Sequence, residues 1–515
     1  MDNVIVGGKA LSLRDFEKIV LDKSKISIDP QAMKKVGASF TFLKSYAADK
    51  VIYGINTGLG PMAQFKISEE DHYQLQYNLI RSHCSGAGNI FTEELARATT
   101  LARLNCFVQG YSGIHPDTIS VMIEFLNQGI SPCIFEKGGV GASGDLVQLA
   151  HLALNLIGEG EVLFEGKLQP AEAVLERLSI APVRVHLREG LALVNGTSAM
   201  TGVGLLNILM AKKLLYCATA LSSMTNELMK SFDDHFSLEL NEAKHHDGQR
   251  KIAAGMRAIL NDSKLVRKRS DHLYHKKIEE AVFTDKVQEY YSLRCVPQVL
   301  GPVYDTLSYA ENVLINEINS VNDNPVIDHE QNNVFHGGNF HGDYVALEMD
   351  KVKTVITKLS MLSERQLNYL LNDRLNQKLP PFINLGKFGF NFGMQGIQFT
   401  ATSTTAENQT LSYPMYLHSI SNNNDNQDIV SMGCNAALMT RRVIENTFDV
   451  LAIHAVALAQ AVDFLKCQTR LSSITLKLYE ELRAIVPVFI DDQPKYKELQ
   501  GVRKYLTSLE PSLIL

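Results

Sequence analysis

The chain has 515 residues, of which 45% are apolar and 21% charged, and its formal net charge is −6. This composition is typical of a soluble globular protein and excludes a largely disordered chain or one with a general affinity for nucleic acid. The seven cysteines form no CxxC pair, which argues against a zinc site or a disulfide framework and favours a reducing compartment.

The N-terminus lacks the features of an export signal. In "MDNVIVGGKALSLRDFEKIV" no basic segment precedes an apolar one. The most apolar segment, residues 202–224, is interrupted by Asn207, Lys212 and Lys213, which argues against a membrane span. We therefore expect a cytoplasmic protein without a membrane partner.

The two halves of the chain differ in their periodicity. The first half has frequent turn signals, as in "YGINTGLGPMAQF" and "HCSGAGNIFTEE". In the second half, apolar residues recur at steps of three and four over 303–318, 345–359 and 444–465, which predicts long helices. We predict a mainly α fold, with a globular N-terminal region (1–200) continuous with a long-helix bundle and C-terminal helical segment (201–515). Apolar seams on long helices favour a homotetramer.

The stretch "KGGVGASGDLVQLAH" surrounds Ser143 with glycines and an alanine. Apolar residues at helical spacing from Leu146 predict that a helix follows, and Asp145 is suited to cap its start. A simple strand-to-helix turn explains this pattern. A phosphate-binding loop does not, because the Gly-Lys-Ser/Thr ending and the Gly-x-Gly-x-x-Gly motif are both missing. A nucleophile elbow fails too, since Gly144 directly follows the serine.

A second interpretation uses the backbone as the reagent. If the amide nitrogen of Gly144 attacks the carbonyl carbon of Ala142, a five-membered ring closes. Loss of water from the ring and from the Ser143 side chain then leaves an exocyclic methylidene, which is an electrophile. Small residues on both sides of the serine leave the clearance that such a closure needs.

Polar side chains interrupt several apolar or glycine-rich segments. Tyr53 and Asn56 lie in "VIYGINTGLG", and Asn195 lies in "LVNGTSAM". In "VQEYYSLRCVPQ", a helix would bring four polar side chains near one face. These are Gln288, Tyr291, Arg294 and Gln298.

The chain resembles the aromatic amino acid ammonia-lyases and related aminomutases over nearly its whole length. The motifs "YGINTGLG", "GGVGASGDL", "GLALVNGTS", "YSLRCVPQ", "NDNP", "GGNFHG" and "NQDIVSMG" occur in the family's order. The resemblance implies that Ala142, Ser143 and Gly144 form a methylidene-imidazolone autocatalytically, with no external cofactor. It also implies a homotetramer whose subunits share active sites.

The resemblance also implies the roles of further residues. The substrate amine adds to the methylidene at Ser143, and Tyr53 acts as the general base. Asn195 and Tyr291 polarise the electrophile, and Arg294 holds the substrate carboxylate in a bidentate contact. The remaining expected substrate-binding residues are Gly60, His83, Gln288, Asn324, Phe340, Asn426 and Gln427.

Two positions bear on the choice of substrate. His83 lies where the histidine enzymes and the tyrosine-acting aminomutases carry a histidine, whereas the phenylalanine enzymes usually carry apolar residues. In "NNNDNQDIVSMG", Asn426 and Gln427 replace the Gln-Glu pair of the histidine enzymes, so the carboxylate that faces an imidazole is missing. We therefore expect L-tyrosine to be converted to trans-p-coumarate and ammonia, as in the bacterial tyrosine-specific lyases. The alternatives are histidine deamination, phenylalanine deamination, tyrosine 2,3-aminomutase action and an inactive structural homologue.

Two further patterns have simpler explanations. The basic run from Lys264 to Lys277 has no aromatic platform, so a solvated surface is expected and not a nucleic-acid site. The Asp and His residues over 233–235 and 245–247 match no known ligand spacing, so no metal site is expected.

Overall fold

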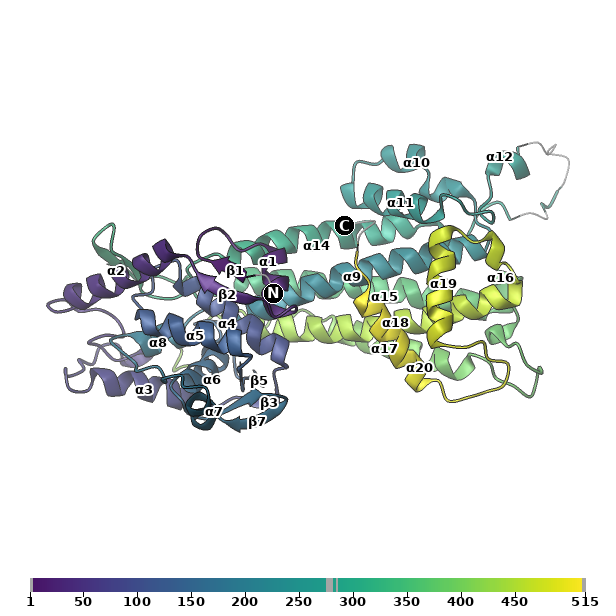
Figure 1. Ribbon diagram of the computed structural model, residues 1–515. Helices are drawn as coiled ribbons and strands as arrows, with labels where there is room; N and C mark the ends of the chain where they lie inside the picture. Colours follow the sequence, from purple (N-terminus) through teal and green to yellow (C-terminus); the bar gives the residue numbers. More distant parts are fainter. Residues whose placement is uncertain (1–2, 275–280, 284–285, 512–515) are drawn as a thin grey trace. The chain divides into compact units, whose positions relative to one another are not determined.

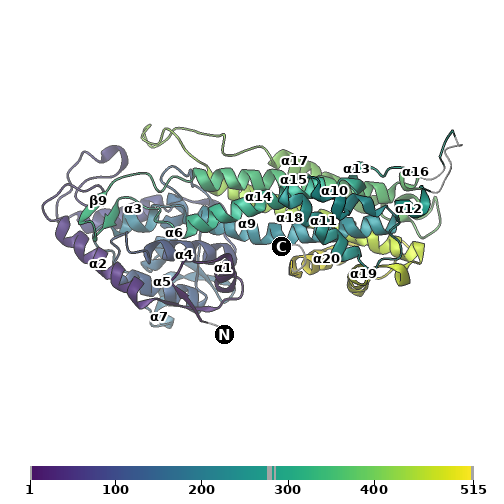
Figure 2. The ribbon, with the colours of Figure 1, turned by 90° about the horizontal axis from the view of Figure 1, so that it is seen from above.

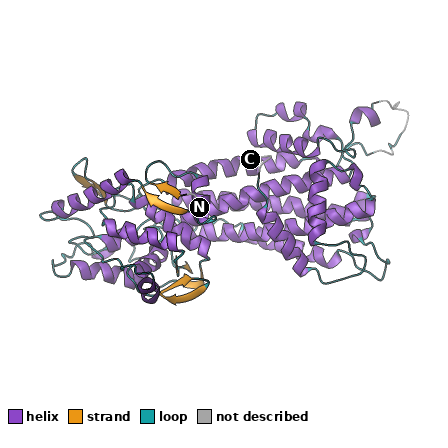
Figure 3. Ribbon diagram, in the orientation of Figure 1, coloured by secondary structure: helices purple, strands orange, loops and turns teal. Residues whose placement is uncertain are grey.

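The computed structural model describes residues 3–274, 281–283 and 286–511. It is mainly helical, as the sequence predicts, with a few short strands (Figure 3). The last three residues of the basic run and the end of the C-terminal tail lie outside the described ranges. The chain forms two compact units. Figure 1 colours the chain by residue number, from purple at the N-terminus to yellow at the C-terminus. Unit 1 comprises Met1–Asn207, Ala310–Asp350 and Pro414–Thr440, and unit 2 comprises Ile208–Tyr309, Lys351–Tyr413 and Arg441–Leu515.

Unit 1 contains short and medium helices and all the described strands. Its helices are α1 (Leu13–Val20), α2 (Pro30–Tyr46), α3 (His72–His83), α4 (Glu93–Phe107), α5 (Pro116–Gln128), α6 (Leu146–Leu156), α7 (Ala171–Arg177) and α8 (Glu189–Val194), with a 3-10 turn at Gly60–Met62. Its strands are β1 (Asn3–Val6), β2 (Lys25–Ile28), β3 (Ala87–Ile90), β4 (Ser131–Pro132), β5 (Phe135–Lys137), β6 (Glu161–Phe164), β7 (Lys167–Pro170), β8 (Val326–Asp328) and β9 (Asn333–Phe335). β1 and β2 pair in parallel, and the β3–β5, β4–β6–β7 and β8–β9 sheets are antiparallel.

Unit 2 contains helices and no described strand. The helices that lie wholly within it are α10 (Leu238–Glu242), α11 (Asp247–Leu260), α12 (Arg269–His272), α13 (Tyr291–Arg294), α16 (Asp373–Asn376), α17 (Gln395–Leu411), α19 (Ser473–Ile485) and α20 (Tyr496–Ser508). Its 3-10 turns are Asp233–Phe236, Pro381–Ile383 and Gln468–Arg470. Four longer helices have residues in both units: α9 (Ser198–Leu228), α14 (Val296–Ile318), α15 (Asp343–Leu371) and α18 (Gly433–Leu465).

The helix boundaries follow local sequence rules. At the start of α2, the Asp29 side chain accepts hydrogen bonds from the amides of Gln31 and Ala32, and Pro30 occupies the first helical position, where no N–H is needed. α5 ends at Gly129, whose φ of 74° is the left-handed conformation that glycine adopts without strain.

The apolar periodicities of the second half lie on long helices. The stripe Val345, Met349, Val352, Ile356 and Leu359 lies on α15 and is fully buried. The stripes over 303–318 and 444–465 lie on α14 and α18, and the C-terminal segment forms α20 as expected. By length and composition alone, α9 and α18 could each cross a membrane. However, 78% of the most apolar 18-residue stretch of each helix is buried within the protein, as in the core helix of a globular fold.

Candidate active site

The turn at Ser143 lies directly before α6, which begins at Leu146 as the sequence predicts. Gly144 has a φ of 74°, and a Cβ there would lie 2.0 Å from the carbonyl oxygen of Gly196. The same carbonyl accepts a 2.8 Å hydrogen bond from the amide of Asp145. A backbone–backbone contact therefore excludes every side chain at position 144, which is a stronger requirement than a simple turn imposes.

Two side-chain amides converge on Ser143 from distant parts of the sequence. Asn195 Nδ2 donates a 3.0 Å hydrogen bond to the Ser143 carbonyl oxygen. Gln427 Nε2 donates one of 3.0 Å to Ser143 Oγ. In a closed methylidene-imidazolone the Ser143 carbonyl would be the ring carbonyl, and Ser143 Oγ is the oxygen lost as water. Asn195 thus holds the atom on which negative charge would develop.

Arg103, which the sequence analysis did not single out, binds the backbone of Asn195. Arg103 on α4 is fully buried, and its Nη1 donates a 2.8 Å hydrogen bond to the Asn195 carbonyl oxygen. The same atom lies 3.3 Å from Asn322 Oδ1. A lone arginine within the apolar segment "LARLNCF" was the sequence signal for this contact, because a buried charge needs polar partners.

Asp145 has a different role from the one expected. It precedes α6, but its side chain makes no capping hydrogen bond to that helix. Instead, its Oδ2 accepts a 2.8 Å hydrogen bond from the amide of Met200 at the start of α9, since the folded chain brings that N-terminus to Asp145. Burial of the carboxyl group raises its pKa to about 7, although the donors at Met200 and Ala199 oppose the rise.

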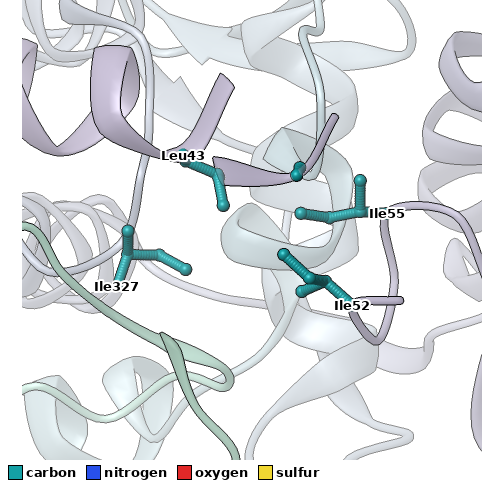
Figure 4. Close-up of a cluster of buried hydrophobic side chains, with 5 residues drawn as sticks. Leu43, Ile52, Ile55 and Ile327 are labelled. Atoms are coloured by element: carbon teal, nitrogen blue, oxygen red, sulfur yellow. The ribbon is translucent and has the colours of Figure 1, made fainter. Parts of the chain in front are cut away.

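The Tyr53 loop is fastened on both sides of the tyrosine. Ile52 and Ile55 are buried in a cluster with Leu43 and Ile327 (Figure 4). The phenol oxygen of Tyr53 accepts a 2.9 Å hydrogen bond from the amide of Gly60, which belongs to the same loop. Because that bond uses a lone pair, the phenol proton is left available for another partner.

His83 is the last residue of α3. Its Nδ1 lies 2.9 Å from the Leu79 carbonyl oxygen and 3.1 Å from Ser82 Oγ. A carbonyl oxygen can only accept, so Nδ1 carries the proton. In the neutral ring, Nε2 is then a hydrogen-bond acceptor.

The turn that carries Asn426 and Gln427 has an unusual backbone. Asn423, Asn424 and Asp425 have φ values of 54°, 55° and 58°. Asn and Asp are the non-glycine residues that enter this left-handed region most readily, which explains "NND" at positions 423–425. The amides and carbonyls of Asn422 and Gln427 pair across the turn and fix the backbone of Gln427.

The site residues of unit 1 line one cavity of about 890 Å³. Nine of the residues expected from the sequence contribute to its lining, and two more belong to the turn at its wall. Tyr53, Gly60, His83, Ser143, Asn195, Asn324, Phe340, Asn426 and Gln427 line the cavity, and Ala142 and Gly144 flank Ser143. Asn324 Oδ1 also accepts a 2.8 Å hydrogen bond from the amide of Gly337.

The rest of the cavity lining is largely apolar. Leu59, Met62, Phe65, Leu79 and Leu146 contribute apolar side chains. Met62, Phe65 and His336 were not singled out from the sequence. Among the described residues that line the cavity there is no aspartate or glutamate. The cavity therefore offers apolar surface for an aromatic ring and neutral polar groups at fixed points.

Three expected site residues belong to unit 2 and are not among the described residues that line the cavity. Tyr291 and Arg294 lie on α13, where the Arg294 guanidinium lies 4.5 Å from the centroid of the Tyr291 ring. The Tyr291 side chain is 70% exposed. Gln288 precedes α13 in an irregular segment, so the helical face proposed for these residues begins only at Tyr291. The extended backbone of Tyr290 (ψ 154°) is the reason.

Comparison with known proteins identifies the family. The model for the aromatic amino acid lyases matches residues 11–484. The chain belongs to the aromatic amino acid lyase family. It is 37% identical to tyrosine 2,3-aminomutase of Chondromyces crocatus over 97% of this chain and 96% of that protein. It is 38% identical to histidine ammonia-lyase of Bacillus subtilis over 98% of this chain and 96% of that protein.

Solved structures of the family share the fold. The tyrosine aminomutase of Streptomyces globisporus superposes with a TM-score of 0.93 at 36% identity, over 98% of this chain and 97% of that one. The phenylalanine aminomutase of Pantoea agglomerans gives 0.95 at 32% identity over 100% of both chains. These relatives are named for different amino acids, although their sequence identities to this chain are similar. The family assignment therefore does not identify the substrate, which has to be inferred from the chemistry of the cavity.

Proposed function

We propose that this enzyme converts L-tyrosine to trans-p-coumarate and ammonia. The observation that carries the proposal is the polar lining of the cavity: His83, with Nε2 as an acceptor, and no carboxylate among the described lining residues. A phenol hydroxyl needs an acceptor for its proton, which Nε2 of His83 supplies. An imidazole substrate is best held by a carboxylate, and position 427 carries an amide instead.

The proposed prosthetic group is a methylidene-imidazolone formed from Ala142, Ser143 and Gly144. The turn fits it, since position 144 tolerates no Cβ and the Ser143 carbonyl already has a donor in Asn195. When formed, the group supplies an electrophilic exocyclic carbon for the substrate amine. Asn195 then stabilises negative charge at the carbonyl oxygen, and Arg103 keeps the Asn195 backbone in place.

The remaining roles are assigned to Tyr53 and to residues of unit 2. Tyr53 takes the proton from the substrate β-carbon after its phenol has given up its own proton. The Gly60 amide, which donates to the phenol oxygen, then stabilises the phenolate beside the cavity that also contains Ser143. Arg294 binds the substrate carboxylate, Tyr291 polarises the electrophile, and Gln288 completes the site. We propose that these three residues reach the cavity from a second copy of the chain in a homotetramer. The exposure of Tyr291 supports this assignment.

The tyrosine 2,3-aminomutase reaction is the second candidate. It is favoured by the 37% identity to the Chondromyces crocatus enzyme over nearly the whole chain. The two reactions share the loss of the amine and of a β-proton. They differ in whether the amine leaves or adds to the β-carbon before the product departs.

Product analysis tests the proposal. The purified enzyme is incubated separately with L-tyrosine, L-histidine and L-phenylalanine, and the products are separated by chromatography with ultraviolet and mass detection. The proposal predicts p-coumarate as the main product. Urocanate without p-coumarate would contradict the tyrosine assignment, β-tyrosine as the main product would favour the aminomutase, and no product from any substrate would indicate an inactive homologue.

A further inference from the structure

The short helix α13, which carries Tyr291 and Arg294, satisfies only part of its own backbone. The Tyr290 carbonyl accepts from the amides of Leu293 and Arg294, at 3.0 Å each. The Tyr291 carbonyl accepts from the amide of Cys295 at 2.9 Å. The next carbonyls belong to Ser292 and Leu293, and a helical partner of Leu293 would be residue 297. That residue is Pro297, which has no N–H to donate.

Two buried side-chain amides supply the donors for these carbonyls. Gln366 Nε2, from α15, donates a 2.8 Å hydrogen bond to the Ser292 carbonyl oxygen. Asn226 Nδ2, from α9, donates one of 3.2 Å to the Leu293 carbonyl oxygen. Both amide side chains are fully buried, and all of these residues belong to unit 2. Figure 2 shows α13 beside α15.

The two amides are themselves held in position. Ser222 Oγ donates a 3.0 Å hydrogen bond to Gln366 Oε1, which fixes the direction of the Gln366 amide. Asn226 Nδ2 also donates to the Ser222 carbonyl oxygen at 3.0 Å, one turn earlier on α9. Because buried amides lose their partners only at a cost, this network holds α13 in one position.

We propose that Gln366, Asn226 and Ser222 are positioning residues for Tyr291 and Arg294. The inference rests on the proposed function, which assigns Arg294 to the substrate carboxylate and Tyr291 to the electrophile. The two anchored carbonyls lie between these side chains in the sequence, so the network fixes the backbone from which both project. Without it, α13 shifts, and a shift of about 1 Å at such a group costs roughly a hundredfold in rate.

The experiment compares two ligands that differ only in the carboxylate. The inhibition constants of trans-p-coumarate and of 4-vinylphenol are measured against the full-length enzyme with L-tyrosine as substrate. Gln366→Met is expected to weaken p-coumarate about tenfold or more while 4-vinylphenol is unaffected, because only the former uses Arg294. KM for L-tyrosine should rise and kcat should fall, since both Arg294 and Tyr291 are displaced.

Matched controls separate positioning from general loss of stability. Gln460 is also fully buried in unit 2 and donates a 2.9 Å hydrogen bond to a loop carbonyl, that of Phe489. Gln460→Met should therefore leave the ratio of the two inhibition constants unchanged. If Gln366→Met does not fold, Ser222→Ala replaces it, with Ser223→Ala as its control. Ser223 is the adjacent buried serine, and its hydroxyl donates to the Thr219 carbonyl of its own helix.

Three results would overturn the inference. The first is an unchanged ratio of inhibition constants in Gln366→Met or Ser222→Ala. The second is equal weakening of both ligands, which indicates a structural defect alone. The third is full additivity of Gln366→Met with Arg294→Ala, since residues that act through one another should not add. Failure of the wild-type enzyme to form product or to bind p-coumarate refutes the proposed function itself, before any variant is compared.

Discussion

The side-chain amide of Asn195 donates a 3.0 Å hydrogen bond to the carbonyl oxygen of Ser143. The residues are 52 positions apart in the sequence, and the contact is maintained by Arg103, which bonds the Asn195 carbonyl. A donor fixed on a carbonyl oxygen before charge appears there stabilises the charged state without having to reorganise.

Asn195→Leu is expected to lower kcat by about 10²- to 10³-fold, because it removes this donor. The buried Asn207, which donates a 2.8 Å hydrogen bond to the Ala437 carbonyl, provides the control. Asn207→Leu should lower stability while the folded enzyme keeps its kcat. Steady-state kinetics on both variants, normalised to folded protein by circular dichroism, check the prediction. Equal kcat losses in the two variants would count against a specific role for Asn195.

Ring formation predicts an intact mass about 36 Da below that of the printed sequence, from two lost waters. Ser143→Ala should have the full sequence mass and no activity, because the hydroxyl to be eliminated is missing. Ser198→Ala removes another buried serine hydroxyl of unit 1 and should keep the mass deficit. Intact-mass spectrometry of the three proteins is the measurement. An unshifted wild-type mass would exclude the methylidene-imidazolone.

Gly144→Ala should prevent the turn from forming. The new Cβ would meet the Gly196 carbonyl oxygen at 2.0 Å, and the φ of 74° adds strain of about 1–2 kcal/mol for a residue with a side chain. Gly166 has nearly the same φ, 75°, and a Cβ added there would have no atom within 4 Å. Gly166→Ala therefore shows only the backbone strain. Chemical denaturation and intact mass of both variants should separate the two effects: only Gly144→Ala loses both the mass deficit and much more stability.

His83→Leu is expected to shift preference from tyrosine towards phenylalanine. Without the Nε2 acceptor, the buried phenol hydroxyl of tyrosine is left unpaired at about 1–3 kcal/mol, or roughly tenfold to a hundredfold in the ratio of kcat/KM values. His72, at the other end of α3, is not among the described lining residues of the cavity, so His72→Leu is the control. An unchanged ratio in His83→Leu would remove His83 from the recognition of substrate.

The pH dependence of stability should include His454 of α18. Burial lowers its pKa from 6.5 to about 3. The Thr225 hydroxyl donates its proton to the Leu221 carbonyl oxygen, so it must accept from Nε2–H of His454. Nδ1 of His454 then accepts a hydrogen bond from the Ser363 hydroxyl. The folded state thus keeps the ring neutral, whereas the unfolded chain binds a proton below pH 6.5. The stabilisation is fully present above pH 6.5 and is lost as pH falls towards about 3.

Between pH 6.5 and 4, the thermal midpoint of His454→Gln should therefore fall less steeply than that of the wild-type protein. The difference in slope corresponds to the uptake of up to about one proton per molecule on unfolding. His246→Gln, at an exposed histidine, is the comparison. Thermal scans at fixed ionic strength provide the measurement. Parallel pH profiles for wild type and His454→Gln would contradict this assignment.

The sequence by itself determined the family, the helical class and the turn at Ser143. Periodicity is a local property, so the long buried stripes on α14, α15 and α18 could be found without a structure. The glycines around Ser143 also carried local information, because a missing Cβ permits either an unusual backbone conformation or a close approach to the backbone. The sequence placed Asp145 correctly at the start of α6. It could not show that the Asp145 side chain bonds the Met200 amide, 55 positions away, and not an amide of its own helix.

Only the tertiary structure decided which residues share the cavity and what each side chain touches. Residues 310–350 and 414–440 join the N-terminal stretch in unit 1, so Asn324 and Gln427 line the same cavity as Tyr53. The support of Asn195 by Arg103 and the hydrogen bonds of Gln366 and Asn226 to α13 depend on contacts between distant segments. Such contacts arise when distant segments pack together, and no periodic pattern in the sequence shows which segments will meet.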